Sequence, residues 1–122
     1  MTLASQVVCL DLARKLKELG VKQESLFAWV DGGVQGDSVI RMTEEKVSLV
    51  EASQWKDYVY SAFTVAELGT MLGDFWCGKQ GDQFHCRRFV HERDESTQVA
   101  DTEADSRAKM LIHLIEQKMV TP

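Results

Sequence analysis

Cys77, His85, Cys86 and His91 are the residues of this chain whose types suit chemistry best, because thiolates and imidazoles are the ligands that zinc prefers. Structural zinc sites usually pair ligands two to four residues apart on turns. His85 and Cys86 are adjacent, and adjacent residues of a strand point to opposite faces of a sheet. The spacing therefore argues against zinc. We interpret the two thiols as small core residues and expect no metal ligand and no cofactor.

The same cluster could instead supply a cysteine nucleophile with a histidine base. Cys86 with His85 or His91 is the neighbourhood in which such a pair could form, but no family signature surrounds it. We therefore predict no catalytic residue and no enzymatic activity. The alternative is a small zinc- or thiol-dependent enzyme centred on Cys77, Cys86 and His91.

Two further classes of site are disfavoured by residue type and charge. Gly32, Gly33 and Gly36 superficially resemble a phosphate-binding loop, but no lysine and Ser/Thr pair follows them. Arg87, Arg88 and Arg93 are too few to form a nucleic-acid surface on a chain with a net charge of -5. We expect neither nucleotide nor nucleic-acid binding.

The composition is that of a soluble globular protein. The chain has 122 residues, of which 44% are hydrophobic and 27% charged, and these values fit a single domain spanning residues 1–122. No apolar stretch approaches the length of about 20 residues that a membrane helix needs. Three cysteines fit reduced thiols in a cytoplasmic protein. A Cys77–Cys86 disulfide is sterically conceivable but is disfavoured in a reducing compartment.

Three helices are predicted to position these residues. Apolar residues at helical spacing predict a first helix over 3–19, ending at Gly20. Thr64 and Glu67 have capping-box spacing, so a second helix should begin at Thr64 and end near Gly73. A last helix follows Thr102, with an apolar stripe formed by Ala104, Ala108, Leu111, Ile112, Ile115 and Met119.

Short β-branched and aromatic runs predict strands over 26–30, 38–42 and 46–51, whereas 54–62 fits either a loop or an edge strand. Segments 75–77 and 84–90 should form a hairpin around Gly81-Asp82, with Cys77 facing Cys86. The apolar alternation slips near Arg87-Arg88, which predicts a bulge. Trp29, Trp55 and Trp76 should contribute at least two side chains to the core.

These elements define an α+β fold in the order α-β-β-β-α-β-β-α. We expect one antiparallel sheet of about five strands covered by three helices.

Candidate binding residues lie on two loops, because exposed loops carry recognition more often than core elements do. The first loop spans 31–37, and the second lies in segment 91–105, which has six acidic residues against one arginine. The candidates are Asp31, Gly32, Gly33, Asp37, Glu92, Asp94 and Glu95. The alternative interpretation is that these are only solvated surface residues.

Segments 60–72 (YSAFTVAELGTML) and 103–112 (EADSRAKMLI) form a pair that resembles small phage and prophage proteins of unknown function from bacteria. Such proteins often begin with a helix similar to residues 12–20 (LARKLKELG). The resemblance implies no activity and no catalytic residue; it implies a cytoplasmic protein encoded by a mobile element. We therefore expect a non-enzymatic protein-interaction module that binds a protein partner or forms a homo-oligomer, without nucleic acid or membrane.

Overall fold

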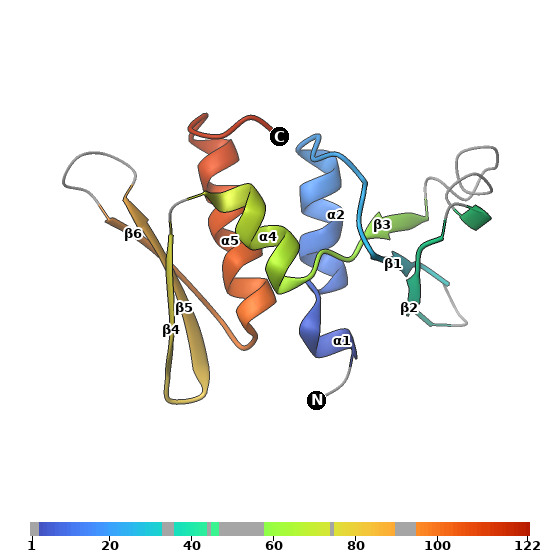
Figure 1. Cartoon of the computed structure of the whole chain (residues 1–122), viewed down its shortest axis with the longest axis horizontal. Coiled ribbons are helices and arrows are strands. Elements are labelled where there is room, and N and C mark those ends of the chain that lie inside the picture. The colour runs from blue at the N-terminus through green and yellow to red at the C-terminus, as the bar shows by residue number, and fades with distance from the viewer. Residues whose placement is uncertain (1–2, 33–35, 44, 47–57, 74, 90–94) are drawn as a thin grey trace.

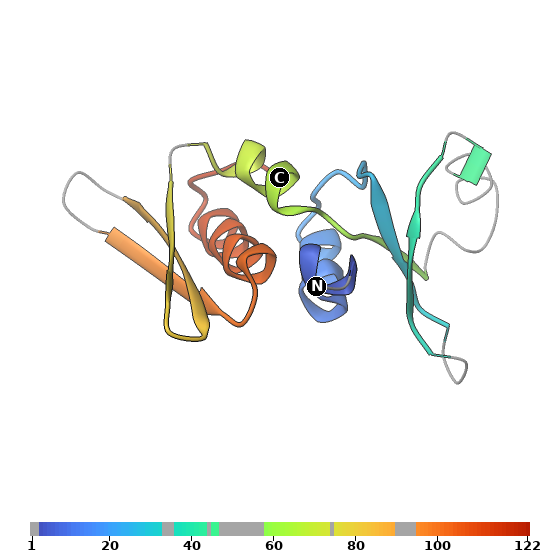
Figure 2. The same ribbon diagram turned by 60° about the horizontal axis from the view of Figure 1, so that its bottom comes forward.

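The chain folds into three layers, with helices in the middle and a sheet on either side (Figure 1). The computed structural model describes residues 3–32, 36–43, 45–46, 58–73, 75–89 and 95–122. Turning the molecule by 60° shows the same layering, with the two sheets still separated by helices (Figure 2). The predicted α+β class is confirmed, but the prediction of one sheet is wrong, because the strands form two three-stranded antiparallel sheets.

The described helices are α1 (Leu3–Gln6), α2 (Leu10–Glu18), α4 (Val65–Leu72) and α5 (Glu103–Glu116). The described strands are β1 (Phe27–Val30), β2 (Ser38–Arg41), β3 (Val59–Ser61), β4 (Trp76–Gln80), β5 (Gln83–Phe89) and β6 (Glu95–Ala100). Among these residues, no helix is both long enough and apolar enough to cross a bilayer.

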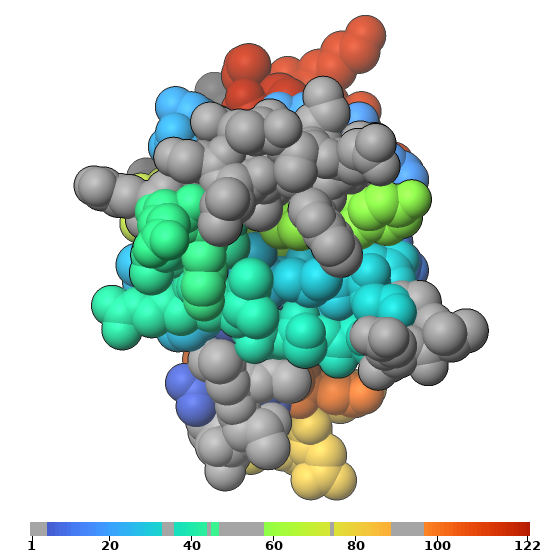
Figure 3. Space-filling view, turned by 90° about the vertical axis from the view of Figure 1, so that its right-hand side faces the viewer, coloured from blue at the N-terminus to red at the C-terminus, as the bar shows by residue number. Residues whose placement is uncertain are grey.

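The first sheet has the strand order β2-β1-β3 and packs its inner face on α2. Trp29 of β1 lies on that face, and its indole Nε1 donates to the Val8 carbonyl at 2.7 Å. Segment 54–62, predicted as either a loop or an edge strand, contains the strand β3 near its C-terminal end. Figure 3 shows the sheet from outside, where β1 and β2 cross the middle of the face in cyan and green. Trp55 and most of the predicted strand 46–51 lie outside the described residues.

The second sheet has the order β4-β5-β6 and contains the predicted hairpin. Its register pairs Cys77 with Cys86, as the Gly81-Asp82 turn predicts. The predicted bulge at Arg87-Arg88 is wrong, since β5 pairs continuously with β6 through both residues. β6 was not predicted, because its polar sequence, ESTQVA, lacks the apolar alternation of a strand and follows a run of acidic residues.

The predicted first helix is interrupted. Residues 7–9 are extended between α1 and α2, and Val7 forms an antiparallel bridge with Thr64. The Val8 amide donates to the Phe63 carbonyl at 2.9 Å, and the Cys9 amide donates to the Asp105 carboxylate at 2.7 Å. Partners from distant segments, one a backbone carbonyl and one a side-chain carboxylate, therefore replace the helical hydrogen bonds that local periodicity predicts.

The capping box at the start of α4 is confirmed. The Thr64 hydroxyl accepts from the Glu67 amide, and the Glu67 carboxylate accepts from the Thr64 amide. The other Glu67 oxygen accepts from the Leu26 amide at 3.2 Å, so this side chain also joins α4 to the segment preceding β1. α4 ends at Gly73, whose φ of 71° is a conformation that glycine adopts without strain.

α5 is the centre of the core. Its cap is Thr102, as predicted, and it packs against α2, α4 and the second sheet. Residues on more than one side of the helix are buried: Ala104, Ser106, Ala108, Met110, Leu111, Ile112, Leu114 and Ile115. The helix ends at Glu116, so Met119 does not belong to its stripe and is 37% exposed.

Candidate binding cleft

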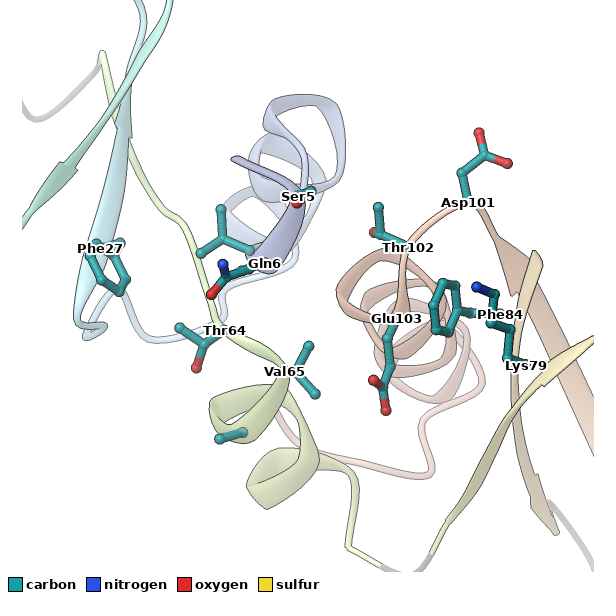
Figure 4. A pocket seen from close by; sticks show the side chains of 12 residues that line it. Ser5, Gln6, Phe27, Thr64, Val65, Lys79, Phe84, Asp101, Thr102 and Glu103 are labelled. Carbon is teal, nitrogen blue, oxygen red and sulfur yellow. The ribbon is translucent and has the colours of Figure 1, made fainter. Parts of the chain in front are cut away.

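An open cleft of about 650 Å³ lies between the two halves of the molecule. It is bordered by α1, β1, the start of α4, the β4–β5 hairpin and the start of α5 (Figure 4). The lining residues are Ser5, Gln6, Val7, Phe27, Thr64, Val65, Ala66, Lys79, Phe84, Asp101, Thr102 and Glu103. This volume falls within the range of about 300–1,000 Å³ that is typical of ligand sites.

The starts of two helices place the cleft's central residues. Thr64 and Thr102 both act as N-caps, and each hydroxyl accepts a backbone N–H of its own helix. The chain enters each helix in an extended conformation, which brings Val65 and Glu103 to the cleft at the first helical position. Figure 4 shows these two side chains between Phe27 at one end and Phe84 at the other.

A partly buried ion pair supports the wall formed by α5. The Glu103 carboxylate accepts from Arg107 Nη2 at 2.8 Å, and Arg107 Nη1 donates to the Val65 carbonyl at 2.8 Å. The Arg107 guanidinium also lies 4.7 Å from the centre of the Phe75 ring. Arg107 thus joins α5 to α4 and to the residue preceding β4, and it fixes the distance between the two helix starts.

The polar rim carries charges of both signs. Lys79 Nζ lies 5.4 Å from the centre of the Phe84 ring, so its charge sits at the hairpin end of the cleft. Asp101 is exposed on the same side of the cleft, next to the start of α5 and directly after Ala100, which pairs with Phe84. The lining contains neither cysteine nor histidine among the described residues. The arrangement therefore offers apolar contact and rim charges, and it does not bring a nucleophile together with an imidazole base.

The structure brings together only part of the predicted thiol cluster. Cys77 and Cys86 face each other across the hairpin, whereas His85 pairs with Gly78 and points to the opposite face of the sheet. His91 lies outside the described residues. Within the part of the chain that is described, no group of three or more His, Cys, Asp or Glu residues could hold a metal ion.

Cys86 is fully buried in the core. Burial, with a smaller contribution from the neighbouring Cys77 thiol, raises the pKa of Cys86 to about 12. Its sulfur is therefore protonated at neutral pH, which is the opposite of what an activated nucleophile requires. Burial likewise raises the pKa of Cys9, the N-cap residue of α2.

The predicted loop residues do not line the cleft. Asp31 is partly buried and accepts from Arg14 Nη2 at 2.7 Å, a contact that raises the pKa of Arg14. Asp31 is thus engaged within the fold, while Asp37 is exposed. Gly32 approaches the backbone of Gly36 so closely that a Cβ on Gly32 would collide with the Gly36 carbonyl. Gly33, Glu92, Asp94 and the Glu95 side chain lie outside what the structure describes.

Trp76 forms a second exposed feature, on the outer face of the second sheet. Its side chain is 58% exposed, and its ring lies over Gly78 with the Arg87 guanidinium 5.1 Å from the ring centre. Of the three tryptophans, Trp29 packs against the core and Trp76 does not. Trp55 lies outside the described residues, so a core position for at least two of them stays a prediction.

Sequence reasoning missed the cleft because its lining comes from five separate segments. Phe27 and Phe84 lie in segments whose pattern predicts only strands. The sequence signal that could have indicated the cleft is the pair of threonine N-caps. Each cap is followed directly by a residue that lines the cleft, Val65 in one helix and Glu103 in the other. What the sequence does not contain is the packing that brings those two starts together.

No protein-family model matches this chain, and no curated protein or solved structure matches it at a significant level.

Proposed function

We propose that this chain is a non-enzymatic protein-interaction module whose cleft binds a short peptide segment of another protein. The observation that carries the proposal is the apolar lining between the two helix starts. Val7, Phe27, Val65, Ala66 and Phe84 form this lining. Grooves of this kind accept one or two apolar side chains of an extended or helical peptide.

Charge selects the kind of segment. The chain has a net charge of -5, and the exposed Asp101 carboxylate stands at the cleft's rim. A negative molecule attracts basic partners and accelerates their encounter. Lys79 lies on the same side of the cleft as Asp101, over the Phe84 ring. The proposed occupant therefore carries an apolar residue next to a lysine or arginine, which the net negative charge of the molecule attracts.

The alternative of a small zinc- or thiol-dependent enzyme is less well supported. Cys86 is buried and its pKa is raised, so it lacks the activated thiolate that thiol catalysis requires at neutral pH. A phage or prophage origin, a cytoplasmic location and self-association are predictions from the sequence alone. The neighbouring genes and a light-scattering mass would test the first and the last of these.

A displayed library of random dodecapeptides provides the test. We expect the wild-type chain to enrich peptides in which an aromatic or aliphatic residue adjoins a basic one. A fluorescein-labelled copy of the enriched peptide would then be titrated against Ala66→Arg. Ala66 is exposed at the first turn of α4, so the arginine fills the cleft without entering the core. We expect binding at least about tenfold weaker, equivalent to about 1.4 kcal/mol.

Gln117→Arg is the matched control. It adds the same side chain and the same charge at the exposed C-cap of α5, the end opposite the cleft. We expect its affinity to equal that of the wild type. An equal loss of peptide affinity in both variants would show that the added charge, and not the cleft, causes the loss. Unchanged binding by Ala66→Arg would rule out the cleft as the binding site.

A further inference from the structure

The hairpin places two thiols directly opposite each other. The turn at Gly81-Asp82 is closed by the pair Gln80 and Gln83, and the pairing continues without interruption to Cys77 and Cys86. Hydrogen-bonded and non-hydrogen-bonded pairs alternate along an antiparallel ladder, and a two-residue turn is closed by a hydrogen-bonded pair. Counting from the turn, Cys77 and Cys86 form a non-hydrogen-bonded pair.

Non-hydrogen-bonded pairs bring side chains closest. Their Cα atoms are about 4.5 Å apart, which lies within the range of about 4.4–6.8 Å that disulfides span. Both side chains lie on the sheet face that packs against the core. The two sulfurs can therefore be joined without moving the strands relative to each other.

The two thiols differ in access. Cys77 is partly exposed, and Cys86 is buried. A soluble oxidant can therefore reach the Cys77 sulfur directly. The Cys86 sulfur has no exposed surface and can react only through Cys77. This asymmetry suits an attacked sulfur and a resolving sulfur.

We propose that Cys77 and Cys86 are a redox modification site that closes reversibly to an intramolecular disulfide. The oxidant is a low-molecular-weight disulfide such as glutathione disulfide. In the first step the Cys77 thiol loses its proton and attacks one sulfur of that disulfide, forming a mixed disulfide and releasing one thiol. In the second step the Cys86 thiol gives up its proton and attacks Cys77 Sγ, which releases the second thiol; this step is slow at neutral pH, where little thiolate is present, and accelerates as the pH rises. Two protein thiols are oxidised, and one disulfide is reduced to two thiols.

The modification has a structural consequence for the cleft. The closed disulfide joins β4 to β5 in the hairpin that carries Lys79 and Phe84 into the cleft. Oxidation would fix that wall and alter peptide affinity. This consequence, unlike the disulfide itself, rests on the proposed function.

The test uses the full chain with Cys9→Ser in every variant, so that only the facing pair remains. Serine is a favourable N-cap residue, and position 9 is the N-cap of α2. The folded protein is incubated with glutathione disulfide, alkylated and digested for mass spectrometry. We expect a cross-linked peptide joining residues 77 and 86, its loss after dithiothreitol, and no lasting glutathione adduct.

Two variants separate the steps. Cys86→Ala removes the resolving thiol without adding a polar group to the core, and a stable glutathione adduct should accumulate at Cys77. Cys77→Ala should leave Cys86 unmodified while circular dichroism shows a folded chain. The decisive protein is the one that retains both Cys77 and Cys86 and that circular dichroism shows to be folded. The proposal is overturned if its two thiols stay reduced, or if glutathione remains bound to Cys77. Peptide titration before and after oxidation tests the consequence separately, because the cross-link stands even where no peptide binds.

Discussion

The carboxylate of Asp105 accepts the backbone N–H of Cys9 at 2.7 Å, across 96 positions of the sequence. Cys9 is the N-cap residue of α2 and provides no side-chain cap of its own. A side chain from the first turn of α5 therefore binds the chain where α2 begins. This contact ties the N-terminal segment to the central helix, next to the bridge between Val7 and Thr64.

Removing that carboxylate should destabilise the whole fold. We expect Asp105→Ala to lower the free energy of unfolding by about 1.5–3 kcal/mol, the range for hydrogen bonds to charged groups. Asp105→Asn should cost less, because its amide oxygen can still accept. Urea denaturation measures both. Asp101→Ala, at an exposed position, is the control and should change stability by no more than about 0.5 kcal/mol.

The capping box of α4 provides a second prediction. Thr64→Ala removes the acceptor for the Glu67 amide and should cost about 1 kcal/mol. Thr70→Ala, in the same helix, removes only an exposed hydroxyl that bonds the Ala66 carbonyl. That control should be neutral or slightly stabilising, since alanine is the better helix former. Equal losses in thermal stability would show that the cap contributes nothing specific.

Gly69 illustrates how one helix position can reverse an ordinary rule. Replacing a mid-helix glycine by alanine usually stabilises by about 1 kcal/mol. Here the added Cβ would lie 2.6 Å from Arg107 Nη1, the atom that donates to the Val65 carbonyl. We expect Gly69→Ala to lose this gain or to destabilise. In an Arg107→Met background, Gly69→Ala should stabilise the protein by the usual amount. If it does not stabilise the protein in that background, Arg107 is not what opposes the added Cβ.

Alkaline pH should reveal the buried thiol. The pKa of Cys86 is raised from 9.0 to about 12 in the folded chain. Unfolding therefore releases a proton between these values, so the contribution of Cys86 to stability is complete below about pH 9 and is lost as the pH rises toward about 12. Denaturation at pH 7, 9 and 10 should show a steeper decline for the wild type than for Cys86→Ala. Parallel declines would contradict the burial effect.

Local signals in the sequence predicted much of the fold. Thr64 with Glu67, the Gly81-Asp82 turn and the Thr102 cap each depend on residues close together in the chain, and all three are confirmed. Errors arose where partners are distant. The periodicity around Val8 carries no sign that its amide bonds to Phe63, and nothing in residues 27–41 indicates that their sheet excludes the later hairpin.

The site was less predictable than the fold for the same reason. The cleft exists because Phe27, Val65 and Phe84, each unremarkable in its own strand or helix, are brought to one opening by tertiary packing. The facing cysteines are the exception, since a hairpin register is a local property. Composition predicted the absence of a basic surface but could not indicate where an apolar one would form.

The central position of α5 has a consequence for biosynthesis. Its side chains fill the space against both α2 and the second sheet, so the segments translated earlier have little to pack on until residues 103–116 leave the ribosome. We expect nascent chains arrested before Glu103 to be digested rapidly by protease. Resistance should appear in one step once α5 is outside the exit tunnel.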